Sequence, residues 1–313
     1  MATYAVTGAA GFIGSHLVDA LLAAGHAVRG LDDLSTGKRE NLDPRCDLRI
    51  GDVADPGAVR ALLAGADGCF HLAAIASVAR TNEDWLGGHR TNLTGSITVL
   101  NEARTARASG PLPVVYASSA AIYGDVSGRV ANEDMTPRPR SAYGADKLGS
   151  ELHAAAGWLV HGVPSFGLRF FNVYGARQDP SSPYSGVISI FARRTADGKP
   201  IEIHGDGRQV RDFIHVSDVV RHLTAAMDYA NSEKGASVTN VCTGRGTTVL
   251  ELARSLARRY GREPDLRFAA RRAGDIRESV GDSTLAAAML GCTARVALDE
   301  GLALLIAADY PVG

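Results

Sequence analysis

The chain has 313 residues, of which 45% are hydrophobic and 21% are charged, and its formal net charge is −1. This composition is typical of a globular α/β protein and excludes a disordered or fibrous chain. The small net charge provides no positive field for a phosphate backbone, so we expect a small-molecule partner and no nucleic acid.

Short apolar runs alternate with helical patterns through the first half of the chain. The runs predict strands at Tyr4–Thr7, Ala27–Leu31, Asp47–Ile50, Gly68–Leu72, Val114–Ser118 and Ser165–Phe170. The amphipathic stretches between them predict helices at Phe12–Ala24, Pro56–Ala64, Trp85–Arg107 and Ala142–Leu159. Strands that are joined by helical crossovers indicate an α/β fold with a Rossmann-type, doubly wound parallel sheet.

The regular alternation weakens after Phe171. Further helices and strands are expected at Ile188–Asp197, Ile201–Ile203, Asp212–His215, Ser217–Tyr229, Val238–Val241 and Thr248–Tyr260. We expect residues 1–168 with about 212–242 to form a dinucleotide-binding domain. Residues from about 169 to 211, with 243–313, are expected to form a smaller C-terminal α/β lobe that holds the substrate.

A glycine-rich loop, Thr7 to Gly14, lies between the first predicted strand and the first predicted helix. In this position glycines let a pyrophosphate approach the backbone N–H groups and the positive end of the helix. Glycines alone also fit an ordinary tight turn. Asp32 ends the next strand, where a carboxylate accepts hydrogen bonds from ribose hydroxyls and repels a 2′-phosphate, so NAD is favoured over NADP. The expected cofactor-binding residues are Gly8, Gly11, Phe12, Ile13, Gly14, Asp32, Asp52, Val53, Leu72, Ala73 and Ala74, with Tyr143 and Lys147.

Tyr143 and Lys147 are four residues apart, and therefore lie one turn apart on the same face of a helix. We expect the lysine to lower the pKa of the phenol, so that a tyrosinate takes a hydroxyl proton as hydride leaves the adjacent carbon. In isolation this pair would be interpreted as a surface pair. Ser119, which follows the end of a predicted strand, can join the same site and favours a catalytic interpretation.

These motifs together resemble those of the extended short-chain dehydrogenase/reductases of the NAD-dependent epimerase/dehydratase family. The chain is most similar to the nucleotide-sugar 4-epimerases typified by UDP-glucose (UDP-galactose) 4-epimerase, from the loop at 7–14 to residues 271–275. The resemblance implies that Tyr143 is the acid/base, that Ser119 hydrogen-bonds the sugar 4-hydroxyl and that Lys147 binds the nicotinamide ribose.

The same resemblance marks substrate-binding segments around Leu168–Gly175, Gln209–His215 and Arg271–Asp275. It implies that Asn172 contacts the diphosphate or sugar, that Arg211 and Arg272 clamp the diphosphate, that Asp275 holds the uridine ribose, that His204 lies near uracil and that Ser77 contacts the substrate. Guanidinium groups pair with phosphate oxygens, and a carboxylate accepts hydrogen bonds from vicinal hydroxyls. Without the resemblance, these segments would be interpreted as solvated charged loops.

The residues after Ser119 bear on which reaction the resemblance favours. Similar sugar 4,6-dehydratases carry an Asp-Glu pair there and UDP-glucuronate decarboxylases carry a nearby glutamate, whereas this chain has Ala120 and Ala121. Epimerisation needs no further acid, because oxidation at C4, rotation of the 4-keto sugar and hydride return complete it. We therefore expect a UDP-sugar 4-epimerase with tightly bound NAD. A dehydratase, reductase or decarboxylase on the same scaffold stays open, as does a non-catalytic NAD-binding regulator, which has no need of the Ser-Tyr-Lys set.

The identity of the sugar stays open at this point. Ser279 matches the position of a bulky gate residue in glucose-restricted epimerases, which leaves room for a 2-acetamido group. UDP-glucose, UDP-galactose, a UDP-N-acetylhexosamine and a UDP-hexuronate are all compatible with the sequence.

Assembly and location are also expectations. The helices near 85–107 and 142–159 resemble those that form an intersubunit four-helix bundle in the family, so we expect a homodimer. No signal peptide and no apolar run of about 20 residues is evident, which favours the cytoplasm and no membrane segment. The cysteines show no C-x-x-C spacing, so free buried thiols and no metal site are expected.

Overall fold

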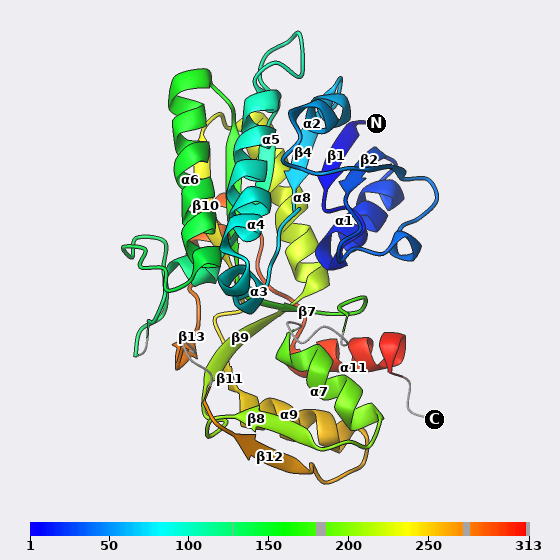
Figure 1. Ribbon diagram of the computed structural model, residues 1–313, viewed down its shortest axis with the longest axis vertical. Coiled ribbons are helices and arrows are strands. Elements are labelled where there is room, and N and C mark those ends of the chain that lie inside the picture. Colours follow the sequence, from blue (N-terminus) through cyan, green and yellow to red (C-terminus); the bar gives the residue numbers. More distant parts are fainter. Residues whose placement is uncertain (127, 180–185, 272–275, 311–313) are drawn as a thin grey trace.

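The computed structural model describes residues 1–126, 128–179, 186–271 and 276–310. Its larger domain is built on a parallel sheet in which seven described strands follow the order β10-β6-β5-β4-β1-β2-β3 (Figure 1). Their bounds are β1 Thr3–Thr7, β2 Ala27–Asp32, β3 Asp47–Ile50, β4 Gly68–His71, β5 Val114–Ser119, β6 Ser165–Phe170 and β10 Ala236–Val241. The order reverses between β1 and β4, as in a doubly wound sheet, and the predicted Rossmann-type fold is confirmed.

Helices cover both faces of this sheet. On one face α1 (Phe12–Ala23) packs beside α8 (Val216–Ser232), and the apolar stripe of α1 meets β1, β2 and β6 in a shared core. The other face carries α2 (Pro56–Leu63), α5 (Gly95–Ala103) and α6 (Ala142–His161). The two hydrophobic cores leave the strand ends and the loops after them to form the site.

The predicted helix over 85–107 forms, but it ends at Ala103 and contains a π-helical turn that the prediction did not include. The segment contains α4 (Trp85–His89), a π-helical turn at Arg90–Thr94, and α5, which ends at Ala103. The side chain of Asn92 in the π turn accepts a hydrogen bond from Ile75 N (2.8 Å) and donates to Ile75 O (3.2 Å). Single π turns inside helices are frequent at functional sites, and this one fixes the loop that follows β4.

A smaller lobe lies at one end of the larger domain (Figure 1). Its sheets contain β9 (Val210–His215) with β7 (Asn172–Tyr174), β11 (Gly246–Thr248) and β13 (Glu278–Ser279), and the parallel pair β8 (Ile201–His204) and β12 (Leu266–Ala269). The helices α7 (Val187–Ala196), α9 (Val249–Arg259) and α11 (Leu298–Asp309) complete its core. The expected domain boundary near residue 212 divides β9, whose pairing assigns the whole strand to the small sheet.

Three shorter elements follow strands of the larger domain: the 3-10 turns Arg39–Asn41 and Ala120–Ile122 and the helix α3 (Val78–Glu83). The helix α10 (Thr284–Leu290) comes after β13 in the chain and returns to pack against α8 and β10. Among the described residues, no helix has both the length and the apolar character needed to cross a membrane.

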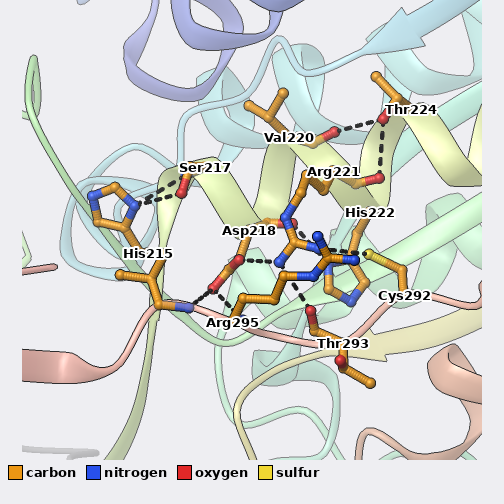
Figure 2. Close-up of polar contacts among 11 residues, drawn as sticks. His215, Ser217, Asp218, Val220, Arg221, His222, Thr224, Cys292, Thr293 and Arg295 are labelled. Carbon is orange, nitrogen blue, oxygen red and sulfur yellow. Dashed lines mark hydrogen bonds and ion pairs between the residues drawn. The ribbon is translucent and has the colours of Figure 1, made fainter. Parts of the chain in front are cut away.

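A buried carboxylate fastens the chain between α10 and α11 to the larger domain. Asp218, at the start of α8, accepts hydrogen bonds from the backbone nitrogens of Arg295 and Val296 (3.0 Å each) and pairs with Arg221 (Figure 2). Arg221 also donates to the carbonyl oxygen of Thr293 (2.9 Å). Because Asp218 is fully buried, these partners compensate the loss of its hydration, and the lobe is held in a defined position against α8.

Candidate active site

In the glycine-rich loop, backbone atoms pack closely against the chain that follows β4 and against the start of α1. Gly8 has a left-handed backbone (φ +68°), and a Cβ there would lie 2.7 Å from Ala73 N. A Cβ on Gly14 would lie 2.0 Å from the carbonyl oxygen of Gly8. Gly11 precedes α1 without a side-chain cap, and the first turn of α1 contains no acid. The first N–H groups of α1 therefore remain available to an anion, and the helix dipole favours one.

Asp32 lies at the end of β2 against this loop. Its carboxylate accepts hydrogen bonds from Ala10 N and Leu34 N (2.9 Å each), and the residue is 7% exposed. Burial raises the pKa of Asp32, and the backbone N–H donors oppose that rise. These bonds fix the Asp32 carboxylate in the wall of the cleft, where a ribose would lie. Each carboxylate oxygen can still accept a further hydrogen bond from a ribose hydroxyl.

One cleft of about 240 Å³ brings together all of the expected cofactor residues apart from Tyr143 and Lys147. Asp52 and Val53 line it after β3, and Leu72, Ala73 and Ala74 line it after β4. The sequence analysis missed other lining residues, among them Asp33, Ser35, Thr36, Ile75, Ala76, Thr91, Ala117 and Phe170. Most of these follow strand ends, so their position depends on the sheet order rather than on a local motif.

Ser119 and Tyr143 meet beside this cleft. Tyr143 is the second residue of α6, a helix capped by Ser141, whose side chain accepts from Gly144 N. A hydrogen bond joins the Ser119 hydroxyl to the Tyr143 phenol, and Ser119 Oγ also accepts from Ala121 N (3.1 Å). A Cβ on Gly144 would lie 2.7 Å from the carbonyl oxygen of Ala121, so glycine permits the close approach. The N-terminal turn of α6 also favours negative charge on the phenol.

The expected lowering of the Tyr143 pKa by Lys147 is not what dominates in the structure. Burial raises the pKa of the Tyr143 phenol, and the hydrogen bond from Ser119 opposes the rise. The Lys147 ammonium lies 5.7 Å from the centroid of the Tyr143 ring and donates to the carbonyl oxygen of Ala117 (2.8 Å). Ala117 itself lines the cleft, so Lys147 connects the phenol to the cleft wall.

Burial also acts on Lys147, which is 2% exposed. Desolvation lowers the pKa of its ammonium from 10.5 to about 8, although Asp146 opposes this change. Between these values the unfolded chain binds more protons than the folded chain, so this group makes the free energy of unfolding rise with pH.

We therefore expect wild type to gain stability over Lys147→Met as the pH increases from about 7 to about 9.5. Urea unfolding of both proteins at the two pH values measures the difference. Taking the difference between the two proteins removes the contribution of every other titrating group. If the stability difference between wild type and Lys147→Met stayed constant or decreased over this pH range, the lowered pKa of Lys147 would be contradicted.

The substrate residues expected from the resemblance lie mostly on the small lobe. Asn172 begins β7 in register with Phe213, and Arg211 on β9 is in register with the buried Ser279. His204 ends β8 and lines a second hollow of about 180 Å³ with Gln209, Arg271 and Arg277. Arg272 and Asp275 lie outside the described residues.

Ser77 is the N-cap residue of α3. Its hydroxyl oxygen accepts from Arg80 N (3.1 Å) and caps α3. Removal of such a cap typically costs about 1 kcal/mol. Any contact to a substrate would use the remaining O–H donor.

A buried histidine connects the glycine-rich loop to the helices. His71 at the end of β4 bonds Thr7 Oγ1 (2.8 Å) and Ser96 Oγ (3.0 Å). Thr7 Oγ1 also accepts from Leu72 N and Ala73 N (3.2 Å each). Burial lowers the pKa of His71 to about 3, so the ring is neutral and acts as a fixed bridge.

Within the described part of the chain, no group of three or more His, Cys, Asp or Glu side chains could hold a metal ion. The site consists of a cleft along the glycine-rich loop and the ends of the central strands, with a serine, a tyrosine and a lysine at its edge.

Comparison with known proteins relates this geometry to a family. The model of the NAD dependent epimerase/dehydratase family matches residues 4–242. The chain belongs to this family. As a member it is 38% identical over 306 residues to UDP-glucose 4-epimerase of Mycolicibacterium smegmatis, and the match covers 95% of each chain.

Solved structures of epimerases match this family member along nearly its whole length. UDP-glucose 4-epimerase from Thermotoga maritima with UDP-glucose gives a TM-score of 0.92 at 37% identity and covers 97% of each chain. UDP-glucose 4-epimerase from Thermus thermophilus with NAD gives 0.89 at 35% identity, covering 97% of this chain and 98% of that one. The likeness therefore includes the lobe as well as the larger domain.

Proposed function

We propose that the protein is an NAD-dependent UDP-sugar 4-epimerase that works through a transient 4-keto sugar and keeps its NAD throughout the cycle. The observation that carries this proposal is the contact of Ser119 with Tyr143, beside a Lys147 that reaches the wall of the cleft. The epimerase relatives support the reaction class. The two residues directly after Ser119 are Ala120 and Ala121, which cannot transfer protons, and this is compatible with epimerisation without an elimination step.

The residues of the cleft fit NAD. Gly8 and Gly14 keep the loop free of Cβ atoms where a phosphate would approach, and Asp32 presents a carboxylate to the adenosine ribose. When bound, NAD supplies the acceptor for hydride from C4 of the sugar and afterwards its donor. The roles of the individual side chains in this scheme are proposals.

The protein's own groups handle the proton. Tyr143 takes the proton of the sugar 4-hydroxyl while Ser119 hydrogen-bonds that oxygen, and C4 loses hydride to become a ketone. Lys147 orients the nicotinamide ribose and stabilises the phenolate. After the 4-keto sugar rotates, hydride returns to the opposite face of C4 and Tyr143 gives the proton back, so substrate and product are isomers.

The uridine diphosphate would be held by the small lobe. We propose Asn172 and Arg211 for the diphosphate or sugar and His204 for the uracil side, with Arg272 and Asp275 following from the resemblance alone. Ser279 is buried beside Arg211 and has a small side chain, which supports room for a 2-acetamido group. We propose UDP-glucose, UDP-galactose and UDP-N-acetylhexosamines as substrates. The product analysis below also decides whether a UDP-hexuronate is a substrate.

The test is a product analysis without added NAD. Purified protein is incubated separately with UDP-glucose, UDP-N-acetylglucosamine and UDP-glucuronate, and products are resolved by chromatography and mass spectrometry. An isobaric 4-epimer is expected with at least one donor. Loss of water or carbon dioxide would instead support a dehydratase or decarboxylase, and no product even with added NAD would support a non-catalytic NAD-binding protein.

We propose a homodimer through the helical segments near 85–107 and 142–159, which contact each other in the fold. Both carry large apolar side chains that are exposed in the single chain: Trp85, Leu86, Leu152, Leu159 and Val160. Large exposed apolar side chains on two such segments favour burial against a second copy, giving four helices at the contact. Light scattering is expected to give twice the chain mass for wild type and a smaller mass for Leu159→Glu. An unassociated wild type would contradict the dimer.

A cytoplasmic location and the two-domain division also remain proposals. The four cysteines, Cys46, Cys69, Cys242 and Cys292, are free and buried, which suits a reducing compartment. Cell fractionation with an antibody against the chain tests the location. The separate cores of the larger domain and the lobe support the division.

A further inference from the structure

A buried ion pair lies directly behind the proposed catalytic residues. Arg169 on β6 donates to Glu151 on α6 through two parallel bonds, Nε to Oε1 (3.0 Å) and Nη2 to Oε2 (2.8 Å). The two side chains are 5% and 8% exposed. A bidentate guanidinium–carboxylate pair is strongly oriented, but burying it also removes both groups from water. Because buried pairs are weak sources of net stability, their position in the fold is the more informative property.

The position of Glu151 continues the series of catalytic residues along α6. Tyr143, Lys147 and Glu151 follow at intervals of four residues and so lie on one side of the helix. Each contacts a residue at the end of β5: Tyr143 bonds Ser119, Lys147 donates to Ala117 O, and Glu151 accepts from Ser118 Oγ. Three successive turns of α6 therefore contact three consecutive residues of β5. The third contact, between Glu151 and Ser118, is the one that has no role in the proposed reaction.

Arg169 extends this network to the other side of the site. Its Nη1 donates to the Tyr123 hydroxyl (2.8 Å), which donates to Asn240 Oδ1 (2.7 Å). Asn240 Nδ2 in turn donates to the carbonyl oxygens of Ala131 (2.9 Å) and Asp282 (3.2 Å). The carboxylate on α6 is therefore connected to the segment that follows Ser119 and to the chain that leaves β13.

We propose that Glu151 is a positioning residue, which holds α6 against β5 through Ser118 and Arg169 so that Tyr143 stays in contact with Ser119. The proposal rests on the proposed epimerase function. Without the third contact, α6 is held less firmly against β5, and the contact between Tyr143 and Ser119 loses part of its support. Proton transfer depends steeply on the relative position of such groups, and misplacement by about 1 Å reduces rates about a hundredfold. The third contact joins α6 to β5 within the larger domain, so its loss acts first on the position of α6.

Two variants test the proposal. Glu151→Gln keeps the shape but leaves Arg169 without its counter-charge, whereas Ser118→Ala removes only the hydroxyl between β5 and Glu151 and leaves the ion pair intact. Ser165→Ala is the matched control, because Ser165 is also a buried sheet serine and its hydroxyl has no hydrogen-bond partner among the described residues. For each protein, kcat, KM for the active UDP-sugar, NAD content and melting temperature are measured.

We expect Ser118→Ala and Glu151→Gln to lower kcat by about tenfold or more, with KM and NAD content within about twofold of wild type. Ser165→Ala is expected to match wild type. Normal kcat in Ser118→Ala overturns the proposal, even if Glu151→Gln fails to fold, and so does an equal loss of kcat in Ser165→Ala. A wild type that forms no 4-epimer contradicts the proposed function as well, whereas active variants contradict the positioning role alone.

Discussion

Replacement of Tyr143 by phenylalanine is expected to lower kcat by a factor of about 10²–10⁴, the range of a lost general acid/base. The phenol oxygen hydrogen-bonds Ser119, and phenylalanine removes this oxygen and with it the proposed proton acceptor. The ring also stays, and with it the packing near Lys147. Initial rates with the best UDP-sugar, measured at saturating substrate, give the change in kcat.

A second tyrosine provides the control for this experiment. Tyr260 donates its hydroxyl hydrogen bond to the carbonyl oxygen of Tyr310 within the small lobe (2.9 Å). Tyr260→Phe also removes one phenolic oxygen, and its turnover is expected to equal that of wild type. Turnover of Tyr143→Phe within a few-fold of wild type would exclude Tyr143 as the acid/base.

The pH dependence of the Tyr143 reaction follows from the burial of the phenol. Burial raises its pKa, so in the protein without cofactor the neutral phenol is favoured over the phenolate at neutral pH. The Ser119 hydroxyl opposes this rise, and the first turn of α6 and the Lys147 ammonium, 5.7 Å from the ring centroid, also favour the phenolate. The sequence analysis expected lysine to determine this pKa, because a sequence shows the spacing of two side chains but not how deeply they are buried.

Local motifs explain why much of the site could be predicted. Gly8, Gly11 and Gly14 fall within one loop, and Tyr143 and Lys147 within one turn of one helix, so each set is read from neighbouring residues. The sheet order then brings these two motifs to the same edge, and the Rossmann-type pattern predicts that order as well.

Contacts between distant segments could not be predicted in this way. Glu151 and Arg169 lie on different elements, and nothing in the sequence near either residue indicates a buried pair. The π turn depends on the side chain of Asn92 reaching the loop after β4, and the helical pattern continues through it. The strands β7 and β13 contain only three and two residues, which is too short for an alternating pattern to be recognised.

Replacement of Gly14 by alanine is expected to remove most of the bound NAD, although helix propensity alone favours the change. Gly14 lies inside α1, where alanine normally stabilises a helix by about 1 kcal/mol. The new Cβ would lie 2.0 Å from the carbonyl oxygen of Gly8, a backbone atom that cannot move without opening the loop. The loop that would face the pyrophosphate must therefore shift, and the affinity for NAD is expected to fall tenfold for about every 1.4 kcal/mol that the shift costs. We expect a loss of several such factors, so that most of the purified protein carries no NAD.

NAD content is measured by denaturing the purified variant and quantifying the released nucleotide per chain. Gly235→Ala is the matched control, because no atom lies within 4 Å of its new Cβ. An unchanged NAD content in Gly14→Ala would contradict the assignment of this loop. Added NAD in excess is expected to restore part of the turnover of Gly14→Ala, since mass action opposes a weakened affinity. Added NAD is expected to leave the low turnover of Tyr143→Phe unchanged, because that variant lacks the proton acceptor but still binds the cofactor.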